Sequence, residues 1–341
     1  MRAAPMWDEA RGSPRFASPG LDRASSATNL PRLASRMSAS SHRIALGREL
    51  EAVPLPEHAV LRIGDSATSP REDLLLDESE PDGRSLRATR DWFQMVIPGT
   101  GSFEVSGGND VLLVPEPSCE PADIAPYLEG TAAAVLLAQR GRFALHATAV
   151  RAAGLVVANS GPRGAGKSTT AMRLIQCGHA LLADDFSPLQ FSETEVLLQG
   201  TGRRPRVTPE TVAKLGLDLP SGSLQRVDGK LILPKLPRTC VRLDLIIDLG
   251  VAEASSGVEI SDLKGLNALV AVEQNAYLAG VMQTLWRGQL LQWAARVSNL
   301  VPVAALRRPE GGSSIDEVAT VIKAALERLS REATGYGTDS A

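Results

Sequence analysis

The stretch GPRGAGKS, from Gly161 to Ser168, constrains this chain more than any other part of its sequence. It matches the pattern G-x-x-x-x-G-K-[ST]. The apolar run LVVAN precedes it, and the helix-like run STTAMRLIQC follows it. Backbone N–H groups in such a turn, together with the N-terminus of the following helix, suit bound phosphate oxygens. The order strand, loop, helix, strand predicts an α/β core in which helices cover the strands.

The motif predicts a role for each of its residues. The loop backbone holds the phosphates of ATP, Lys167 reaches the outer phosphates, and Ser168 ligates Mg²⁺. The predicted nucleotide-binding residues are Gly161, Pro162, Arg163, Gly164, Ala165, Gly166, Lys167, Ser168 and Thr169. Arg163 either contacts phosphate or is a solvated loop residue.

Two carboxylates, Asp184 and Asp185, end the apolar run ALLADD that follows the loop and its helix. In a protein with this loop, an Asp at a strand end commonly helps to hold Mg²⁺. Successive strand side chains point in opposite directions, so one carboxylate can serve the metal while the other meets an acceptor hydroxyl. The alternative is a pair of aspartates that only shapes a turn.

His146 lies in the strand-like run FALHATAV, 15 residues before Gly161. If that strand neighbours the strand of the loop, the imidazole can approach the two aspartates. It would then orient an aspartate that acts as general base. A histidine on an apolar strand can also be a purely structural core residue.

The runs LHATAV, GPRGAGKST and GHALLADD, in this order and at these separations, resemble the catalytic domain of HPr kinase/phosphorylase. The resemblance covers about residues 142–189. It implies a P-loop core of the HPr kinase/PEP carboxykinase-like type and transfer of the γ-phosphate of ATP to a serine hydroxyl. It further implies that Asp184 is the base supported by His146, with Lys167 at the transferred phosphate. Asp185 and Ser168 would then form the Mg²⁺ environment.

The stretch LLQGTGRRPRVTP departs from the pattern of that family. It contains neither the Glu nor the Arg-Gly-Leu-Gly-like run of the second signature, which argues against phosphorolysis. The chain is more similar to short HPr-kinase-like proteins of peptide-modification clusters, some of which phosphorylate a serine of a lasso-peptide precursor. This resemblance implies a protein or peptide substrate with an acceptor serine. A small-molecule kinase and a non-catalytic nucleotide-binding protein remain alternatives.

Three arginines in this stretch, Arg203, Arg204 and Arg206, have two interpretations. They either hold a phosphate or an acidic acceptor, or they form a solvated basic loop.

Composition narrows the class of partner. The net charge of −3 and a pI near 5.9 argue against general nucleic-acid binding. The three cysteines form no CxxC pair, so neither a disulfide framework nor a zinc site is expected, and a reducing cytoplasm is the natural location. No apolar run has the length of a membrane helix. Whether the chain forms a homo-oligomer is left open.

The sequence also suggests a domain division. We expect a disordered extension over residues 1–41, rich in Arg, Ser, Pro and Ala, with translation starting at Met1 or Met37. The segment has no apolar core, so it is not a secretory signal. A small β-rich module should occupy residues 42–121, with a hairpin over SFEVSGGNDVLLV and partial disorder around 65–84. The catalytic domain then covers 122–330, beginning with a helix, and residues 331–341 form a disordered tail.

Overall fold

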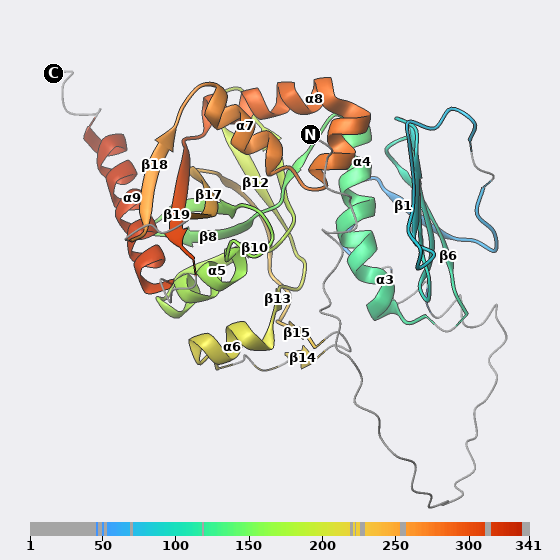
Figure 1. Cartoon of the computed structure of the whole chain (residues 1–341), viewed down its shortest axis with the longest axis horizontal. Coiled ribbons are helices and arrows are strands. Elements are labelled where there is room, and N and C mark those ends of the chain that lie inside the picture. Colours follow the sequence, from blue (N-terminus) through green and yellow to red (C-terminus); the bar gives the residue numbers. More distant parts are fainter. Residues whose placement is uncertain are drawn as a thin grey trace, which may run out of the picture.

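The computed structural model describes Leu46, Leu50 and residues 53–335, except for 69–70, 118, 219–220, 222, 226–228, 253–256 and 311–314. The extension expected over residues 1–41 lies outside the described residues, as does segment 336–341 of the expected tail. Residues 331–335, which were expected to belong to a disordered tail, are instead the last turn of helix α9 (Ile315–Gly335). The chain is a mixed α/β protein with several sheets (Figure 1).

The N-terminal region forms a six-stranded sheet with the order β1-β6-β5-β4-β3-β2. Its strands are β1 (Val60–Ile63), β2 (Leu76–Ser79), β3 (Ser85–Ala88), β4 (Trp92–Ile97), β5 (Gly101–Ser106) and β6 (Asp110–Pro115). The expected hairpin is the antiparallel pair β5–β6. The expectation of disorder around 65–84 is wrong for β2, which pairs antiparallel with β3. This strand escaped notice because LDES is polar and lies at a sheet edge, where one side can face water.

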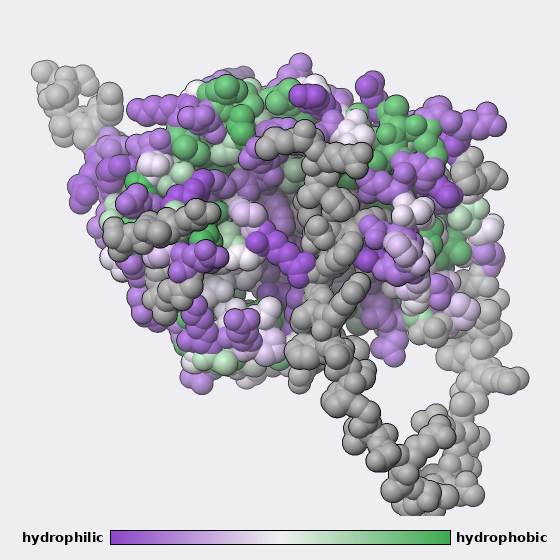
Figure 2. Space-filling model, viewed as in Figure 1, coloured by the Kyte–Doolittle hydropathy of each residue, from purple (hydrophilic) through white to green (hydrophobic). Residues whose placement is uncertain are grey.

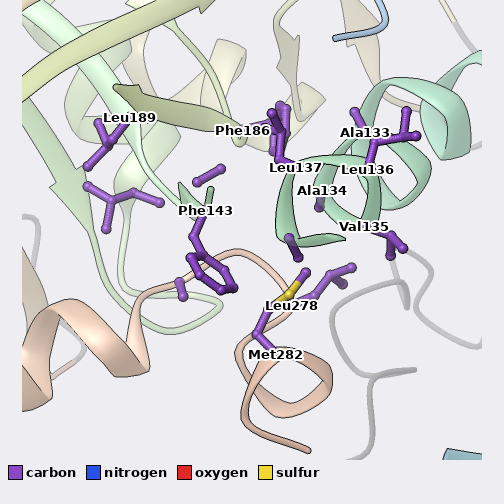
Figure 3. Close-up of a cluster of buried hydrophobic side chains, with 14 of the residues drawn as sticks. Ala133, Ala134, Val135, Leu136, Leu137, Phe143, Phe186, Leu189, Leu278 and Met282 are labelled. Atoms are coloured by element: carbon purple, nitrogen blue, oxygen red, sulfur yellow. The ribbon is translucent and has the colours of Figure 1, made fainter. Parts of the chain in front are cut away.

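A helical layer lies between this sheet and the remaining chain (Figure 1). It consists of α3 (Pro121–Tyr127), the π-helical turn η1 (Leu128–Ala132) and α4 (Ala133–Gln139). Every residue from Ala133 to Ala138 is buried, since the layer is covered on both sides. Figure 3 shows Ala133–Leu137 of α4 beside Phe186, Leu278 and Met282, which all belong to one apolar cluster.

The central sheet has the order β10-β8-β9-β17-β19-β18. Its strands are β8 (Thr148–Ala152), β9 (Leu155–Ser160), β10 (Ala180–Ala183), β17 (Leu245–Ala252), β18 (Glu259–Leu263) and β19 (Val303–Pro309). Strands β9, β17 and β19 run parallel, whereas β8 is antiparallel to β9 and β18 to β19. The carboxyl ends of the parallel strands therefore meet at one edge, where ligands bind in open α/β sheets.

Helices cover both faces of the central sheet (Figure 1). Alternate residues of β9 and β17, such as Val157 and Ile247, share a cluster with residues of α5 (Lys167–Gln176) and α9. Their sequence neighbours Val156 and Ile246 belong to the other cluster, which contains residues of α7 (Leu266–Gln274) and α8 (Ala279–Leu300). These strands are apolar on both faces because both are buried.

Two smaller sheets extend the structure beside β10. One has the order β16-β12-β11-β7, and the other β13-β15-β14. The elements are β7 (Ala144–Leu145), β11 (Ser187–Phe191), β12 (Val196–Thr201), β13 (Arg206–Val207), helix α6 (Pro209–Leu215), β14 (Leu224–Gln225), β15 (Leu231–Ile232) and β16 (Arg238–Arg242). The arginine-rich stretch 203–206 follows β12, and at Arg206 it comes back to the carboxyl end of β10.

The run FALHATAV is not one continuous strand. It divides into β7, which pairs with β11, and β8, which belongs to the central sheet. His146 lies at the break, and its backbone N–H donates to the carbonyl of Asn275 at 2.8 Å. An isolated bridge joins Leu145 to Ala276. Non-local pairing with the segment between α7 and α8 therefore places His146 where the chain enters the central sheet.

The surface has no single apolar face in the view of Figure 2, where hydrophilic residues surround separate hydrophobic patches. Within the described part of the chain, no helix has the length and apolar character needed to cross a membrane.

Candidate active site

The glycine-rich loop joins β9 to α5. Gly161, Gly164 and Gly166 have φ angles of 133°, 82° and 101°, which glycine adopts without the steric cost of a Cβ atom. A Cβ on Gly161 would collide with the carbonyl oxygen of Leu249 on β17, whereas a Cβ on Gly164 meets no described atom within 4 Å. Gly161 is therefore required both by its backbone angle and by the close approach of β17.

Lys167 lies over the loop that precedes it. Its Nζ donates to the carbonyl oxygen of Gly161 at 2.6 Å and to that of Pro162 at 3.3 Å. The ammonium group is thereby placed against the first turn of the loop. Pro162 and Arg163, which follow Gly161 in the loop, are exposed to solvent.

Arg308, at the end of β19, contacts the other half of the loop. Its Nη2 donates to the carbonyl oxygen of Gly164 at 3.2 Å, and its Nε to that of Ala165 at 3.3 Å. Sequence reasoning did not single out Arg308, because 143 residues separate it from Ala165.

Ser168 and Thr169 follow Lys167 in the first turn of α5 and differ in their surroundings. The Thr169 hydroxyl is 3.2 Å from the hydroxyl of Thr211 on α6, so it joins two helices. Ser168 is partly buried and comes directly after the residue that begins the helix.

Asp184 follows β10 and is buried, with 9% of its surface exposed. Its Oδ1 accepts a hydrogen bond from the Thr148 hydroxyl at 3.1 Å, and its Oδ2 accepts from the backbone N–H of Arg206 at 3.0 Å. Thr148 lies directly opposite Asn159 on β9, two residues before Gly161. Asp184 therefore belongs to the side of the site nearest the start of the loop.

Asp185 has a φ of 67°, which redirects the chain after β10. Its side chain is 40% exposed, and its Oδ1 is 2.9 Å from His146 Nε2. The Arg206 guanidinium lies 4.0 Å from its Oδ2. His146 was expected to support Asp184, and the structure corrects this: the imidazole pairs with Asp185. The left-handed backbone at Asp185 turns the second carboxylate toward the break between β7 and β8.

The pKa values of the two aspartates are displaced in opposite directions. Burial raises the pKa of Asp184 and the negative charge of Asp185 adds to this, against hydrogen bonds from Arg206 and Thr148. Burial also acts to raise the pKa of Asp185, but the His146 hydrogen bond and the charges of His146, Arg203 and Arg206 hold it far below its ordinary value. Asp185 is therefore the carboxylate that stays ionised, while Asp184 resists ionisation.

The raised pKa of Asp184 predicts that Asp184→Asn stabilises the fold. A carboxyl whose folded pKa lies above its unfolded pKa loses stability as pH rises from the unfolded toward the folded value. We therefore expect the Tm of Asp184→Asn to exceed that of the wild type, with a difference that grows from acid to neutral pH. Thermal unfolding between pH 4 and 8 without added metal measures this. A difference that stays constant with pH would contradict the assignment.

The three arginines after β12 have different surroundings. Arg203 is 5% exposed, and its Nε lies 3.4 Å from Glu129 Oε2 of the π-helical turn. Arg204 is exposed, and its Nε donates to the carbonyl oxygen of Leu233 at 3.1 Å. Arg206 contacts both aspartates, one through its backbone and one through its side chain. They are therefore not one solvated basic loop.

Several contact residues were missed by sequence reasoning. They are Thr148, Glu129, Arg308 and Tyr277, whose ring packs edge-on against the His146 imidazole with centroids 5.7 Å apart. Thr148 could have been identified from the sequence, since it follows His146 by two residues in LHATAV. The others come from segments distant in sequence, and no local pattern connects them to the loop.

Comparisons with known proteins say little about the family or the function of this chain. Neither the models of protein families nor the curated proteins gave a match. Among solved structures, the chain is similar to the structure of the Hpr(Ser) kinase/phosphatase from Coxiella burnetii, with 12% sequence identity and a TM-score of 0.33. The alignment covers 58% of this chain and 99% of that chain. Because this likeness is distant, the function is argued from the residues of the site.

Proposed function

We propose that this protein is an ATP-dependent kinase with a P-loop core of the HPr kinase/PEP carboxykinase-like type. It would transfer the γ-phosphate to a serine hydroxyl of a protein or peptide. The observation that carries the proposal is the His146–Asp185 pair beside Asp184 and the glycine-rich loop. The loop suits phosphate, and an ionised carboxylate oriented by an imidazole suits a hydroxyl.

The loop side of the site supports the binding of ATP. The N-terminus of α5 and the glycine-rich turn offer backbone N–H groups to phosphate oxygens. Lys167 Nζ contacts the carbonyl oxygens of Gly161 and Pro162. When ATP binds, its phosphate oxygens would replace these carbonyls as partners, and the ammonium group would stay at the loop. Arg308 holds the loop from the opposite side through Gly164 and Ala165.

Asp184 and Ser168 fit Mg²⁺ better than the expected pair of Asp185 and Ser168. Asp184 lies on the loop side of the site, and a nearby cation would offset the burial that raises its pKa. The described residues include no group of three His, Cys, Asp or Glu that could hold a metal. Mg²⁺ needs only one or two protein oxygens when phosphates and water complete its shell. The metal would supply charge neutralisation on the phosphates.

Asp185 is the better candidate for the base. Its side chain is 40% exposed and pairs with His146, whereas both oxygens of Asp184 accept hydrogen bonds inside the protein. Asp185 would accept the proton of the serine hydroxyl as the new bond to phosphorus forms. A carboxylate with a low pKa is a weak base, but phosphoryl transfer depends mainly on positioning and charge stabilisation. The proton of the serine hydroxyl need only pass to Asp185 late in the transfer, when the bond from oxygen to phosphorus has largely formed.

The proposal predicts phosphoserine as the product. The purified full chain, incubated with Mg²⁺ and [γ-³²P]ATP, should label serine-containing peptides in a peptide library and not the matching peptides with alanine. Phosphoamino-acid analysis identifies the labelled residue. Label found only in metabolites would instead identify a small-molecule kinase, and absence of turnover despite ATP binding would identify a non-catalytic nucleotide-binding protein. Either result would contradict the proposal.

A further inference from the structure

Arg203 is an unusually placed charge. It is 5% exposed, and its guanidinium carbon lies 5.5 Å from the centroid of the Phe186 ring. Its Nε faces Glu129 Oε2 at 3.4 Å. Its Nη1 is buried and has no hydrogen-bond partner among the described residues. Arginine stays protonated in proteins, so this N–H group cannot be removed by loss of charge.

A buried donor without an acceptor is costly and therefore calls for an explanation. A water molecule would satisfy one N–H group. An oxyanion would satisfy the N–H group and add to the charge compensation that Glu129 already provides, because the planar guanidinium fork matches phosphate oxygens. The chemistry of Arg203 therefore favours a phosphoryl group as its partner.

The surrounding elements place Arg203 beside the proposed base. Strand β12, which precedes Arg203, packs against β10, and the carbonyl oxygen of Leu182 lies against Gly200. The Phe186 ring, over which the guanidinium lies, belongs to the residue that directly follows Asp185. Arg203 thus belongs to the acceptor side of the site.

Glu129, the partner of Arg203, lies in the π-helical turn η1 between α3 and α4. Such turns are frequent at functional sites. A Cβ on Gly130 would lie 2.5 Å from the Tyr277 hydroxyl oxygen and 3.9 Å from Arg203 Nη2. The Tyr277 ring in turn packs edge-on against His146 and Phe186, with centroids 5.7 and 5.0 Å apart. Glycine at 130 leaves room for this packing.

We propose that Arg203 binds the phosphoryl group during its transfer, and that Glu129 is the positioning residue that holds Arg203 in place. This inference rests on the proposed kinase function. In the step, the bond from the γ-phosphorus to the bridging oxygen breaks and ADP leaves with the electron pair. The acceptor oxygen forms the new bond to phosphorus, and its proton passes to Asp185.

Aluminium fluoride tests this binding without an acceptor, since with Mg²⁺ and ADP it mimics the phosphoryl group in transfer. We measure the affinity for ADP with and without fluoride. The wild type should bind ADP more tightly with aluminium fluoride. Arg203→Lys and Arg203→Ala should lose most of this enhancement and keep their affinity for ADP alone. Arg87→Ala removes a half-buried arginine of the N-terminal sheet that pairs with Asp77, and it should keep the enhancement.

Glu129→Gln separates positioning from a general structural role. We expect kcat to fall roughly tenfold, as for residues that orient a functional group, while KM for ATP stays unchanged. Combined with Arg203→Lys, it should add little further loss of fluoride enhancement, because both changes remove the same contact. Equal effects on kcat and on ADP affinity, or full additivity in the double variant, would overturn the role of Glu129.

The outcomes also separate this inference from the proposed function. Enhancement that survives in both Arg203 variants overturns the role of Arg203 even if peptide serine is phosphorylated. Enhancement that depends on Arg203, with no peptide labelled, supports the phosphoryl site and contradicts only the proposed acceptor. A wild type that fails to bind Mg²⁺·ADP overturns both.

Discussion

Asp185→Asn is expected to lower kcat for phosphoryl transfer by about 10²–10⁴-fold, the range for loss of a general base. The amide has nearly the shape of the carboxylate and can keep a hydrogen bond to His146, which lies 2.9 Å from Asp185. It cannot accept the proton of the acceptor hydroxyl. The KM for ATP should change little, because Asp185 lies on the acceptor side. Steady-state kinetics with a labelled peptide measure both constants.

Asp184→Asn is the matched control, since it makes the same chemical change at the neighbouring residue. Here the amount of Mg²⁺ needed for half-maximal activity should rise, because the loop-side carboxylate is lost. Part of the activity should return at high Mg²⁺. If Asp184→Asn instead abolishes transfer at saturating Mg²⁺ while Asp185→Asn leaves it intact, then Asp184 is the base, as the resemblance to HPr kinase/phosphorylase implies.

Gly161→Ala should have the largest effect on the loop itself. Its φ of 133° and the carbonyl of Leu249 both exclude a Cβ atom, so the loop or β17 must move. We expect nucleotide binding to be lost and the free energy of unfolding to fall by more than the 1–2 kcal/mol typical of left-handed strain alone. Urea unfolding and titration with Mg²⁺·ATP measure the two effects.

Gly164→Ala separates strain from collision. It shares the positive φ, at 82°, but its Cβ would meet no described atom within 4 Å. We expect a loss of about 1–2 kcal/mol from the backbone angle, and nucleotide binding that is weakened but measurable. Equal losses in the two variants would show that the approach of β17 does not constrain the loop.

The glycine-rich loop and the acidic pair could be located from sequence because both depend on local patterns. An apolar run, a glycine-rich turn and a helix in succession determine strand, loop and helix without reference to distant residues. Asp184 and Asp185 follow an apolar run that forms β10. The order of these elements, and the fact that they lie near one another, could therefore be predicted from hydrophobic periodicity and turn residues.

The residue that pairs with the His146 imidazole could not be predicted from the sequence. Alternation along a strand places Asp184 and Asp185 on opposite faces, but it does not say which face His146 occupies. That choice depends on the φ of 67° at Asp185 and on the break after β7. The break depends in turn on pairing with the segment around Ala276, 131 residues after Leu145. A local pattern carries no information on a contact of that range.

The acceptor side of the site was the least visible in the sequence. Arg203 was a candidate only as one member of a basic cluster, and the structure separates it from Arg204 and Arg206 by burial. Glu129 had no signal, because a π-helical turn has no recognisable residue pattern. Sequence reasoning therefore located the glycine-rich loop and the acidic pair better than it located the residues around Arg203.

The antiparallel strand β8 next to β9 has a consequence for how such a site can diversify. Strands β8, β9 and β10, with the loop and α5, bring His146, Lys167, Asp184 and Asp185 together from one short segment of the chain. The residues around Arg203 come from three other segments. In the proposed kinase, changes in those segments would alter which hydroxyl is admitted, while His146, Lys167 and the two aspartates stay in place.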